Sequence, residues 1–288
     1  MIKSISVRVA GGLGNQLFQL AAAISISKKT HLPVSLWLGA LSNYRTPRKF
    51  GLSEILDINN LVQHVNSRQN ILLQSRIARI LPGHCFGFWL VSDKNFMQAK
   101  TIDGAKSVLM DGYFIESMDQ DTFDDAVRRF TAHLIIPQKE CQDGRKVCAI
   151  HFRGGDFVNL GWISSDIEFY YRKAIDMVLK RDPSVEFFVC TDDQSYAKSL
   201  MARIGIEANI RDGSLTQDFW DIASTDFAIL SNSTFAFWAG AFRPRSPRGW
   251  TTIAPDDWRP GAKRQIRLAS EKYCGSAPLN SGNYHHHQ

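Results

Sequence analysis

Residues 146–156 read Lys-Val-Cys-Ala-Ile-His-Phe-Arg-Gly-Gly-Asp, an apolar run that ends in a charged, glycine-containing turn. Residues 147–150 form a short apolar run, which is typical of a strand covered on both faces of a parallel sheet. His151, Arg153 and Asp156 follow it on a glycine-containing turn. Because ligands of open α/β sheets bind beyond the carboxyl ends of the strands, these side chains are placed where a substrate would lie. The alternative is a surface Arg–Asp pair beside a histidine that only satisfies the strand end.

Arg153 points most clearly to a chemistry. A guanidinium group suits phosphate oxygens because it offers two donors at once, and Gly154 and Gly155 let the backbone approach a ligand closely. The formal net charge of +6 also favours an anionic partner, whether a nucleotide, a phosphorylated lipid carrier or a membrane surface. We do not expect nucleic acid as a partner, since the basic residues are scattered and not interleaved with aromatics in one run.

The second half of the chain alternates between strand and helix patterns. Strands are expected at residues 147–152, 185–191, 208–210, 227–230 and 251–254, and helices at about residues 166–180, 195–204, 216–224 and 234–242. Such alternation indicates βαβ units and a parallel, doubly wound sheet. The segment from Asp256 onward is polar, and we expect it to pack back across the first half.

The first half has a similar but less regular pattern. Strands are expected at residues 5–9, 34–38 and 108–110, and helices at about residues 17–29, 70–81 and 122–134. A polar stretch at residues 137–145 predicts the domain boundary. The predicted fold is therefore α/β with two domains, at residues 1–143 and 144–288.

Composition is that of a soluble globular protein, with 44% hydrophobic and 22% charged residues among 288. We expect no membrane-spanning segment and no signal peptide. The 5 cysteines have no CxxC spacing, and Cys148 and Cys190 lie in expected core strands, which predicts a reducing compartment and argues against zinc.

A glycine turn at residues 11–16, Gly-Gly-Leu-Gly-Asn-Gln, follows the first strand and opens a helix whose N-terminus can bind an anion. It matches the dinucleotide fingerprint poorly, because Leu17 stands where the third glycine belongs and no acid follows the second strand. We expect Gly14 and Asn15 to contact a ligand. The alternative is a plain tight turn with a helix cap.

Two further turns follow predicted strands. Ser231, Asn232, Ser233 and Thr234 open an aromatic-rich helix and suit a diphosphate, or serve only as a cap. Thr191-Asp192-Asp193 ends another strand; one carboxylate can accept from a guanine, both can bind a metal, or they only complement the dipole of the next helix. The aromatic residues at 235–242 are expected to be core.

These motifs, taken in order, resemble those of the bacterial α-1,2-fucosyltransferase family, which shares them with plant and animal α-1,2 enzymes and more distantly with α-1,6 and protein O-fucosyltransferases. The matching stretches are residues 11–19 (GGLGNQ-x-FQ), 46–50 (Pro-Arg-x-aromatic), 112–114 (Gly-Tyr-aromatic), 151–157 (H-x-R-R-G-D-Y), 191–193 (S-D-D), 231–238 (N-S-S/T-F-S-W-W) and 254–258 (A-P-x-x-W). Two departures stand out: Gly154 replaces the second arginine, and residues 236–238 read Ala-Phe-Trp.

The resemblance implies two Rossmann-like domains facing a cleft, the GT-B arrangement of glycosyltransferases. The donor would be GDP-β-L-fucose and no metal or other cofactor would be needed. L-Fucose would move with inversion to the 2-hydroxyl of a galactose-type acceptor, in an oligosaccharide or a lipid-linked, O-antigen-like glycan. The enzyme would be cytoplasmic, held near an anionic inner-membrane face by its basic charge.

The resemblance also implies roles for individual residues. Arg153 would neutralise the donor pyrophosphate, and Asp156 is the best candidate for the general base, with His151 as the third catalytic candidate. The donor would contact Gly14, Asn15, Asp192 and Ser231 to Thr234. A rival interpretation is an inactive GDP-sugar-binding module, which the glycine at 154 favours; an NAD-dependent enzyme is a more distant one.

Overall fold

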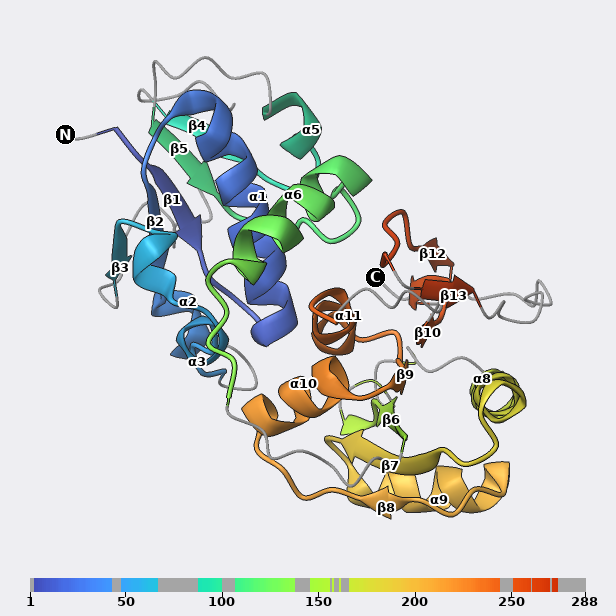
Figure 1. Cartoon of the computed structure of the whole chain (residues 1–288). Coiled ribbons are helices and arrows are strands. Elements are labelled where there is room, and N and C mark those ends of the chain that lie inside the picture. The colour runs from blue at the N-terminus through green and yellow to red at the C-terminus, as the bar shows by residue number, and fades with distance from the viewer. Residues whose placement is uncertain are drawn as a thin grey trace.

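The computed structural model of the chain describes residues 3–42, 48–66, 88–99, 107–137, 146–155, 157, 161, 166–243, 251–259, 261–269 and 271–273. Two parallel sheets flanked by helices make up the molecule (Figure 1). The α/β class predicted from the sequence is therefore confirmed. The boundary predicted at 143/144 lies outside the described residues and stays a prediction, as does the helix predicted at 70–81.

The first sheet is five-stranded, in the order β3-β2-β1-β5-β4, and its strand pairs are parallel. Its strands are β1 (Ile5–Arg8), β2 (Val34–Trp37), β3 (His64–Asn66), β4 (Phe88–Val91) and β5 (Ser107–Met110). Its helices are α1 (Leu13–Thr30), α2 (Gly39–Ser42), α3 (Leu52–Ile55), the 3-10 turn η1 (Ile58–Asn60), α5 (Phe96–Ala99) and α6 (Gln120–Thr131). The strands predicted at 5–9, 34–38 and 108–110 are confirmed. β3 and β4 were not predicted; β3 is an edge strand with exposed side chains and has no apolar run.

The second sheet is six-stranded, in the order β13-β10-β9-β6-β7-β8, and is also parallel. Its strands are β6 (Val147–Phe152), β7 (Glu186–Thr191), β8 (Asn209–Ile210), β9 (Phe227–Ile229), β10 (Thr252–Ala254) and β13 (Glu271–Tyr273). Its helices are α8 (Ile167–Arg181), α9 (Gln194–Ile204), α10 (Leu215–Ser224) and α11 (Thr234–Ala241). The elements predicted in this half are confirmed, and β6 and β9 are buried apolar runs. β13, at the edge of the sheet, was not predicted, since its sequence Glu-Lys-Tyr has no apolar run.

Helix α1 begins at Leu13, earlier than the predicted residue 17. Gly12 is its N-cap and has an extended backbone (φ −75°, ψ 175°), without a side-chain capping hydrogen bond. The sequence therefore gave no cap signal at the true start. Asn15 and Gln16 lie inside the first turn, so their side chains are free to bond to groups outside the helix.

An aromatic core joins the two halves of the chain. Phe18 of α1 packs against Trp238 of α11, with ring centroids 5.2 Å apart, and against Trp258 at 5.7 Å. Phe123 of α6 packs against Phe237 of α11 at 5.2 Å. Burying each such ring is worth roughly 1.5–3 kcal/mol. The aromatics at 235–242 thus belong to the core as predicted, and this core spans both sheets.

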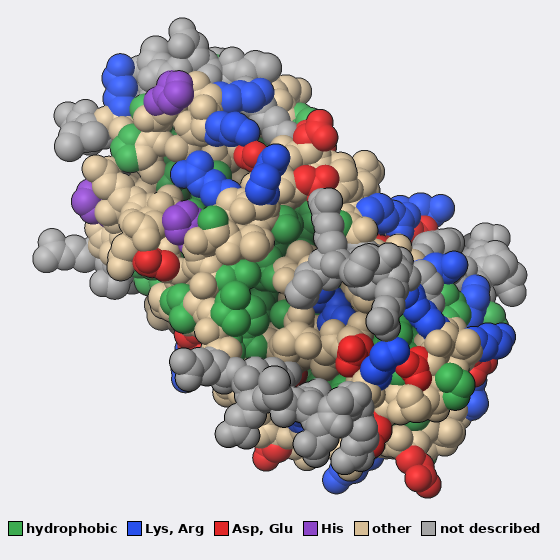
Figure 2. Space-filling model, in the orientation of Figure 1, with side chains coloured by type: hydrophobic (Ala, Val, Ile, Leu, Met, Phe, Trp, Pro, Cys, Tyr) green, Lys and Arg blue, Asp and Glu red, His purple; other side chains and the backbone are tan. Residues whose placement is uncertain are grey.

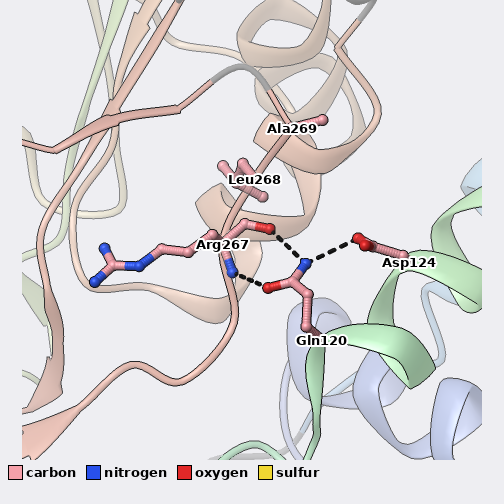
Figure 3. Close-up of a pocket in the computed structure, with 5 residues that line it drawn as sticks. All are labelled: Gln120, Asp124, Arg267, Leu268 and Ala269. Carbon is pink, nitrogen blue, oxygen red and sulfur yellow. Dashed lines mark hydrogen bonds between the residues drawn. The ribbon is translucent and has the colours of Figure 1, made fainter.

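The last segment packs against the first half, as predicted. It contains the antiparallel pair β11 (Asp257–Arg259) and β12 (Ala262–Lys263). The amide of Gln120, on α6, donates to the carbonyl of Arg267 (3.0 Å) and accepts from its N–H (2.7 Å), as Figure 3 shows. These bonds cross a groove of about 360 Å³ that is lined by Gln120, Asp124, Arg267, Leu268 and Ala269.

Three further features concern the charged surface, the helices and the buried cysteines. Lys and Arg side chains are spread over both halves on the face seen in Figure 2, in line with the scattered charge of the sequence. No helix in the described part of the chain is both long and apolar enough to cross a membrane. Cys148 and Cys190 are buried free thiols of the second sheet.

Candidate donor site at the strand ends

Three neighbouring strands of the second sheet end at the same edge and carry the predicted site residues. β6 lies between β9 and β7, with Ile150 opposite Ile229 and Phe152 opposite Thr191. The turns that follow these strands begin at Arg153, Asp192 and Leu230. The expectation that the strand-end turns lie side by side is therefore confirmed for these three strands.

Arg153 is held by Asp192. Its Nη1 lies 2.5 Å from Asp192 Oδ2, while Asp192 Oδ1 accepts from the N–H of Gly154 at 3.0 Å. The guanidinium carbon also lies 5.0 Å from the centre of the Phe157 ring. The Arg153 side chain remains 19% exposed, so a ligand can reach it. Asp192 therefore fixes the direction of Arg153. The guanine contact expected of one carboxylate in this turn stays a prediction.

The two glycines of the turn are required by close contacts. A Cβ on Gly155, whose φ is +45°, would lie 2.5 Å from Asp192 Oδ2. A Cβ on Gly154 would lie 2.8 Å from the Cβ of Asp193 and 2.9 Å from the Tyr196 ring. An arginine at 154, as in the family pattern, would therefore need the start of α9 to shift. Asp193 is the N-cap of that helix and accepts from the N–H of Tyr196, which confirms the simpler interpretation of this acid.

His151 is buried and neutral. Its Nδ1 lies 2.8 Å from Ser231 Oγ, and its carbonyl accepts from the Tyr171 hydroxyl at 2.8 Å. Burial, and then the charge of Arg153, lower the pKa of His151 from 6.5 to about 3. The imidazole thus stays uncharged at neutral pH and holds the Ser231 side chain in place.

This lowered pKa predicts that the protein becomes less stable as the pH is lowered. The unfolded chain takes up a proton at His151 near pH 6.5, whereas the folded protein resists it until about pH 3. The contribution of His151 to the free energy of unfolding is therefore fully present above about pH 6.5. Below that pH it is lost by up to about 1.4 kcal/mol per pH unit. Urea unfolding at pH 7, 6, 5 and 4 should show a weaker decline for His151→Asn. His64→Asn is the control, because His64 is exposed, and this variant should keep the wild-type dependence of the free energy of unfolding on pH. The same dependence in the wild-type protein and in both variants would contradict the prediction.

The turn at Ser231 to Thr234 is held by side-chain bonds. Ser233 is the N-cap of α11 and accepts from the N–H of Phe235 at 3.3 Å, so the capping interpretation is confirmed for this residue. Asn232 Nδ2 donates to the carbonyl of Trp258 at 3.2 Å. Thr234 Oγ1 donates to Asn15 Oδ1 at 2.8 Å. The turn is therefore preorganised, and its last bond reaches the other half of the chain.

Gly14 and Asn15 bring the first turn of α1 to the first turn of α11. A Cβ on Gly14 would lie 2.3 Å from both the Phe235 nitrogen and the Thr234 carbonyl carbon, so the two helix backbones touch here. The side-chain amide nitrogen of Asn15, Nδ2, lies over Gly11, and a Cβ added to Gly11 would be 2.5 Å from it. Gly14 thus packs one half on the other, while Asn15 brings an amide beside the turn that follows β9.

Gln16 and Gln19 have roles that sequence reasoning missed. Gln16 Nε2 donates to the carbonyls of Gly11 (3.0 Å) and Lys49 (2.8 Å), and its Oε1 accepts from the N–H of Gly51 (3.0 Å). Gln19 accepts from the N–H of Ala10 (3.1 Å) and donates to the carbonyl of Gly112 (3.0 Å). Both are buried. They gather the loops at the carboxyl edge of the first sheet around the start of α1.

Asp218 is a third residue that sequence reasoning missed. It lies in the first turn of α10 beside Cys190, whose strand position is opposite His151. Burial raises the pKa of Asp218 to about 6. Perturbed carboxyl groups beside strand ends are candidate functional groups. From the sequence it was indistinguishable from an ordinary first-turn acid. Asp156 lies outside the described residues, and its role stays a prediction.

Known proteins resemble the chain in both sequence and fold. The model of glycosyl transferase family 11 matches residues 94–265. An alpha-1,2-colitosyltransferase of Escherichia coli is 27% identical over 278 residues, covering 88% of this chain and 92% of the relative. The O-antigen biosynthesis glycosyltransferase WbnK of Escherichia coli is 24% identical over 301 residues, covering 87% and 98%.

Solved fucosyltransferases share the fold. The alpha-1,6-fucosyltransferase NodZ soaked with GDP-fucose superposes with a TM-score of 0.51 at 13% identity, covering 84% of this chain and 93% of that one. NodZ from Bradyrhizobium gives 0.50 at 15% identity, covering 85% and 95%. At such identities the likeness establishes the arrangement of helices and strands alone.

Proposed function

Because the chain belongs to glycosyl transferase family 11, we propose that it transfers L-fucose from GDP-β-L-fucose to the 2-hydroxyl of a galactose-type acceptor, with inversion. Its place would be the synthesis of a surface polysaccharide of the O-antigen kind, in keeping with the names of its two relatives. The acceptor would be an oligosaccharide or a lipid-linked glycan. The enzyme would act in the cytoplasm, with basic side chains drawing it to an anionic membrane surface.

The observation that carries the proposal is the fixed arginine at the strand ends. As the glycosidic bond breaks, the leaving diphosphate gains negative charge, and a preorganised donor stabilises that charge without reorganising. Asp192 holds Arg153 in one direction, and the hydroxyls of Ser231 and Thr234 lie on the neighbouring turn. The N-terminus of α11 adds a partial positive charge at the same edge.

Inversion by single displacement also needs a base for the acceptor hydroxyl. Asp156 is the proposed base, and Asn15 the proposed contact to the donor from the first half. The Arg153 guanidinium and the turn at Ser231 can neutralise the diphosphate, so we propose that no metal is required and expect EDTA to leave turnover unchanged. If Asp156 is the base, the pH–rate profile of Asp156→Asn should lose the rise of the rate with pH on the acidic side, because that rise reports deprotonation of the base.

Transfer assays with labelled donors test the function. The purified protein is incubated with GDP-fucose and a panel of β-galactosides, and the expected product carries an α-1,2-linked fucose. GDP-colitose is run in parallel because one relative is named a colitosyltransferase. Binding of GDP without transfer or donor hydrolysis would favour the inactive module, and failure to bind GDP at all would overturn the proposal.

A further inference from the structure

We propose that Arg8, Asp111 and Trp37 form the subsite that holds the acceptor saccharide, at the carboxyl edge of the first sheet. This inference rests on the proposed transferase function and adds the residues that bind the second substrate. The three residues lie at the ends of three neighbouring strands, since β1 lies between β2 and β5. Arg8 is opposite Trp37 in the register, and Asp111 directly follows β5.

The charged pair is close and accessible. Arg8 Nη1 lies 3.2 Å from Asp111 Oδ1, and the two side chains are 25% and 16% exposed. A carboxylate accepts hydrogen bonds from neighbouring sugar hydroxyls, and a guanidinium donates to them. The pair thus presents both kinds of partner that an uncharged saccharide needs.

Trp37 adds an aromatic face. Its side chain is half-buried, and its indole nitrogen is buried with no hydrogen-bond partner among the residues that the structure describes. The nitrogen is therefore out of reach of a ligand, and it is the exposed part of the ring that can cover the apolar face of a sugar.

The position of this edge is what connects it to transfer. Gln19 ties Ala10 and Gly112, which follow β1 and β5, to α1. The first turn of α1 in turn touches the first turn of α11, beside the residues proposed to hold the donor. The contact between α1 and α11 therefore lies next to the carboxyl edges of both sheets. A saccharide bound at the first edge would face a donor bound at the second.

Three substitutions test the subsite: Arg8→Gln, Asp111→Asn and Trp37→Phe. Arg8→Gln removes the guanidinium charge and its paired donors, Asp111→Asn replaces one acceptor oxygen by a donor, and Trp37→Phe reduces the aromatic face. We expect KM for the β-galactoside acceptor to rise about tenfold or more in each variant. The affinity for GDP and the rate of acceptor-independent hydrolysis of the donor should stay within about twofold of wild type. A general disturbance of the structure would change these two quantities as well.

The control is the ion pair between Lys28 and Asp125, which joins α1 to α6 at 3.0 Å. Asp125→Asn should leave the KM for the acceptor unchanged. An unchanged acceptor KM in all three test variants, or an equal loss of GDP affinity, would overturn the subsite.

Direct binding separates this inference from the proposed function. Saturation-transfer NMR with lactose, in the presence of GDP, should give a signal for the wild-type protein that is lost in Asp111→Asn. This readout needs no turnover, so it remains decisive if transfer assays fail. A lactose signal that persists in the variants, or its absence from the wild-type protein, would contradict the subsite.

Discussion

Replacing Arg153 by alanine is expected to lower kcat/KM for transfer by at least about a hundredfold while the protein stays folded. Removing one preorganised donor from a developing anion costs about 10²–10³ in kcat. The protein should stay folded because Arg153 lies on a turn outside the apolar core, where it is partly exposed and pairs with Asp192. Initial rates with GDP-fucose, together with a thermal melt of the same sample, measure both effects.

Two variants sharpen this result. Asp192→Asn keeps Arg153 but weakens its fixation, so we expect a smaller loss, about tenfold. Arg203→Ala removes another arginine of the same half. Arg203 lies in the last turn of α9 and pairs with Glu168 of α8, so its loss should leave the rate unchanged. An active, folded Arg153→Ala, or equal losses for the Arg153 and Arg203 variants, would contradict the assignment.

Gly14→Ala is expected to destabilise the protein by about 2–3 kcal/mol. Alanine favours a helix over glycine by about 1 kcal/mol. Here, however, the added Cβ would lie 2.3 Å from the backbone of Thr234 and Phe235, which cannot turn aside as a side chain can. Overpacking of this kind costs about 1–3 kcal/mol and occasionally more. The contact therefore outweighs the propensity, and urea unfolding measures the balance.

The matched control for this prediction is Gly12→Ala. Gly12 precedes α1 with a φ of −75° that any residue adopts, and a Cβ there would meet no atom within 4 Å. Because alanine is a poorer N-cap than glycine, we expect a cost of at most about 1 kcal/mol. If Gly14→Ala proves as stable as Gly12→Ala, the helix contact between the two halves is not as close as described. Because Asn15 bonds to Thr234 across this contact, Gly14→Ala should also reduce turnover.

The sequence was most informative where apolar runs are bounded by polar residues. β6 has the predicted bounds of 147–152, because a buried parallel strand leaves a continuous apolar signature. β3 and the start of α1 leave none. The three residues of β3 lie at an exposed edge, and Gly12 caps α1 without a side-chain bond.

The site was predictable as a place but not as a set of partners. Topology alone sets the strand-end turns side by side, since parallel strands end at one edge. The bond between Asn15 and Thr234 joins residues 219 positions apart, and no local pattern encodes such a pair. Gly14 illustrates the limit: its donor contact stays a prediction, whereas its contact with the backbone of α11 is revealed only by the packing of the two halves.

If Arg153 binds the diphosphate of a guanosine donor, calorimetry should show it in a comparison of GDP with guanosine. Wild-type protein should bind GDP about tenfold to a hundredfold more tightly than guanosine, as expected for charge-assisted hydrogen bonds. In Arg153→Ala that difference should largely disappear, while the affinity for guanosine stays the same. A variant that binds GDP as tightly as the wild-type protein would contradict the account.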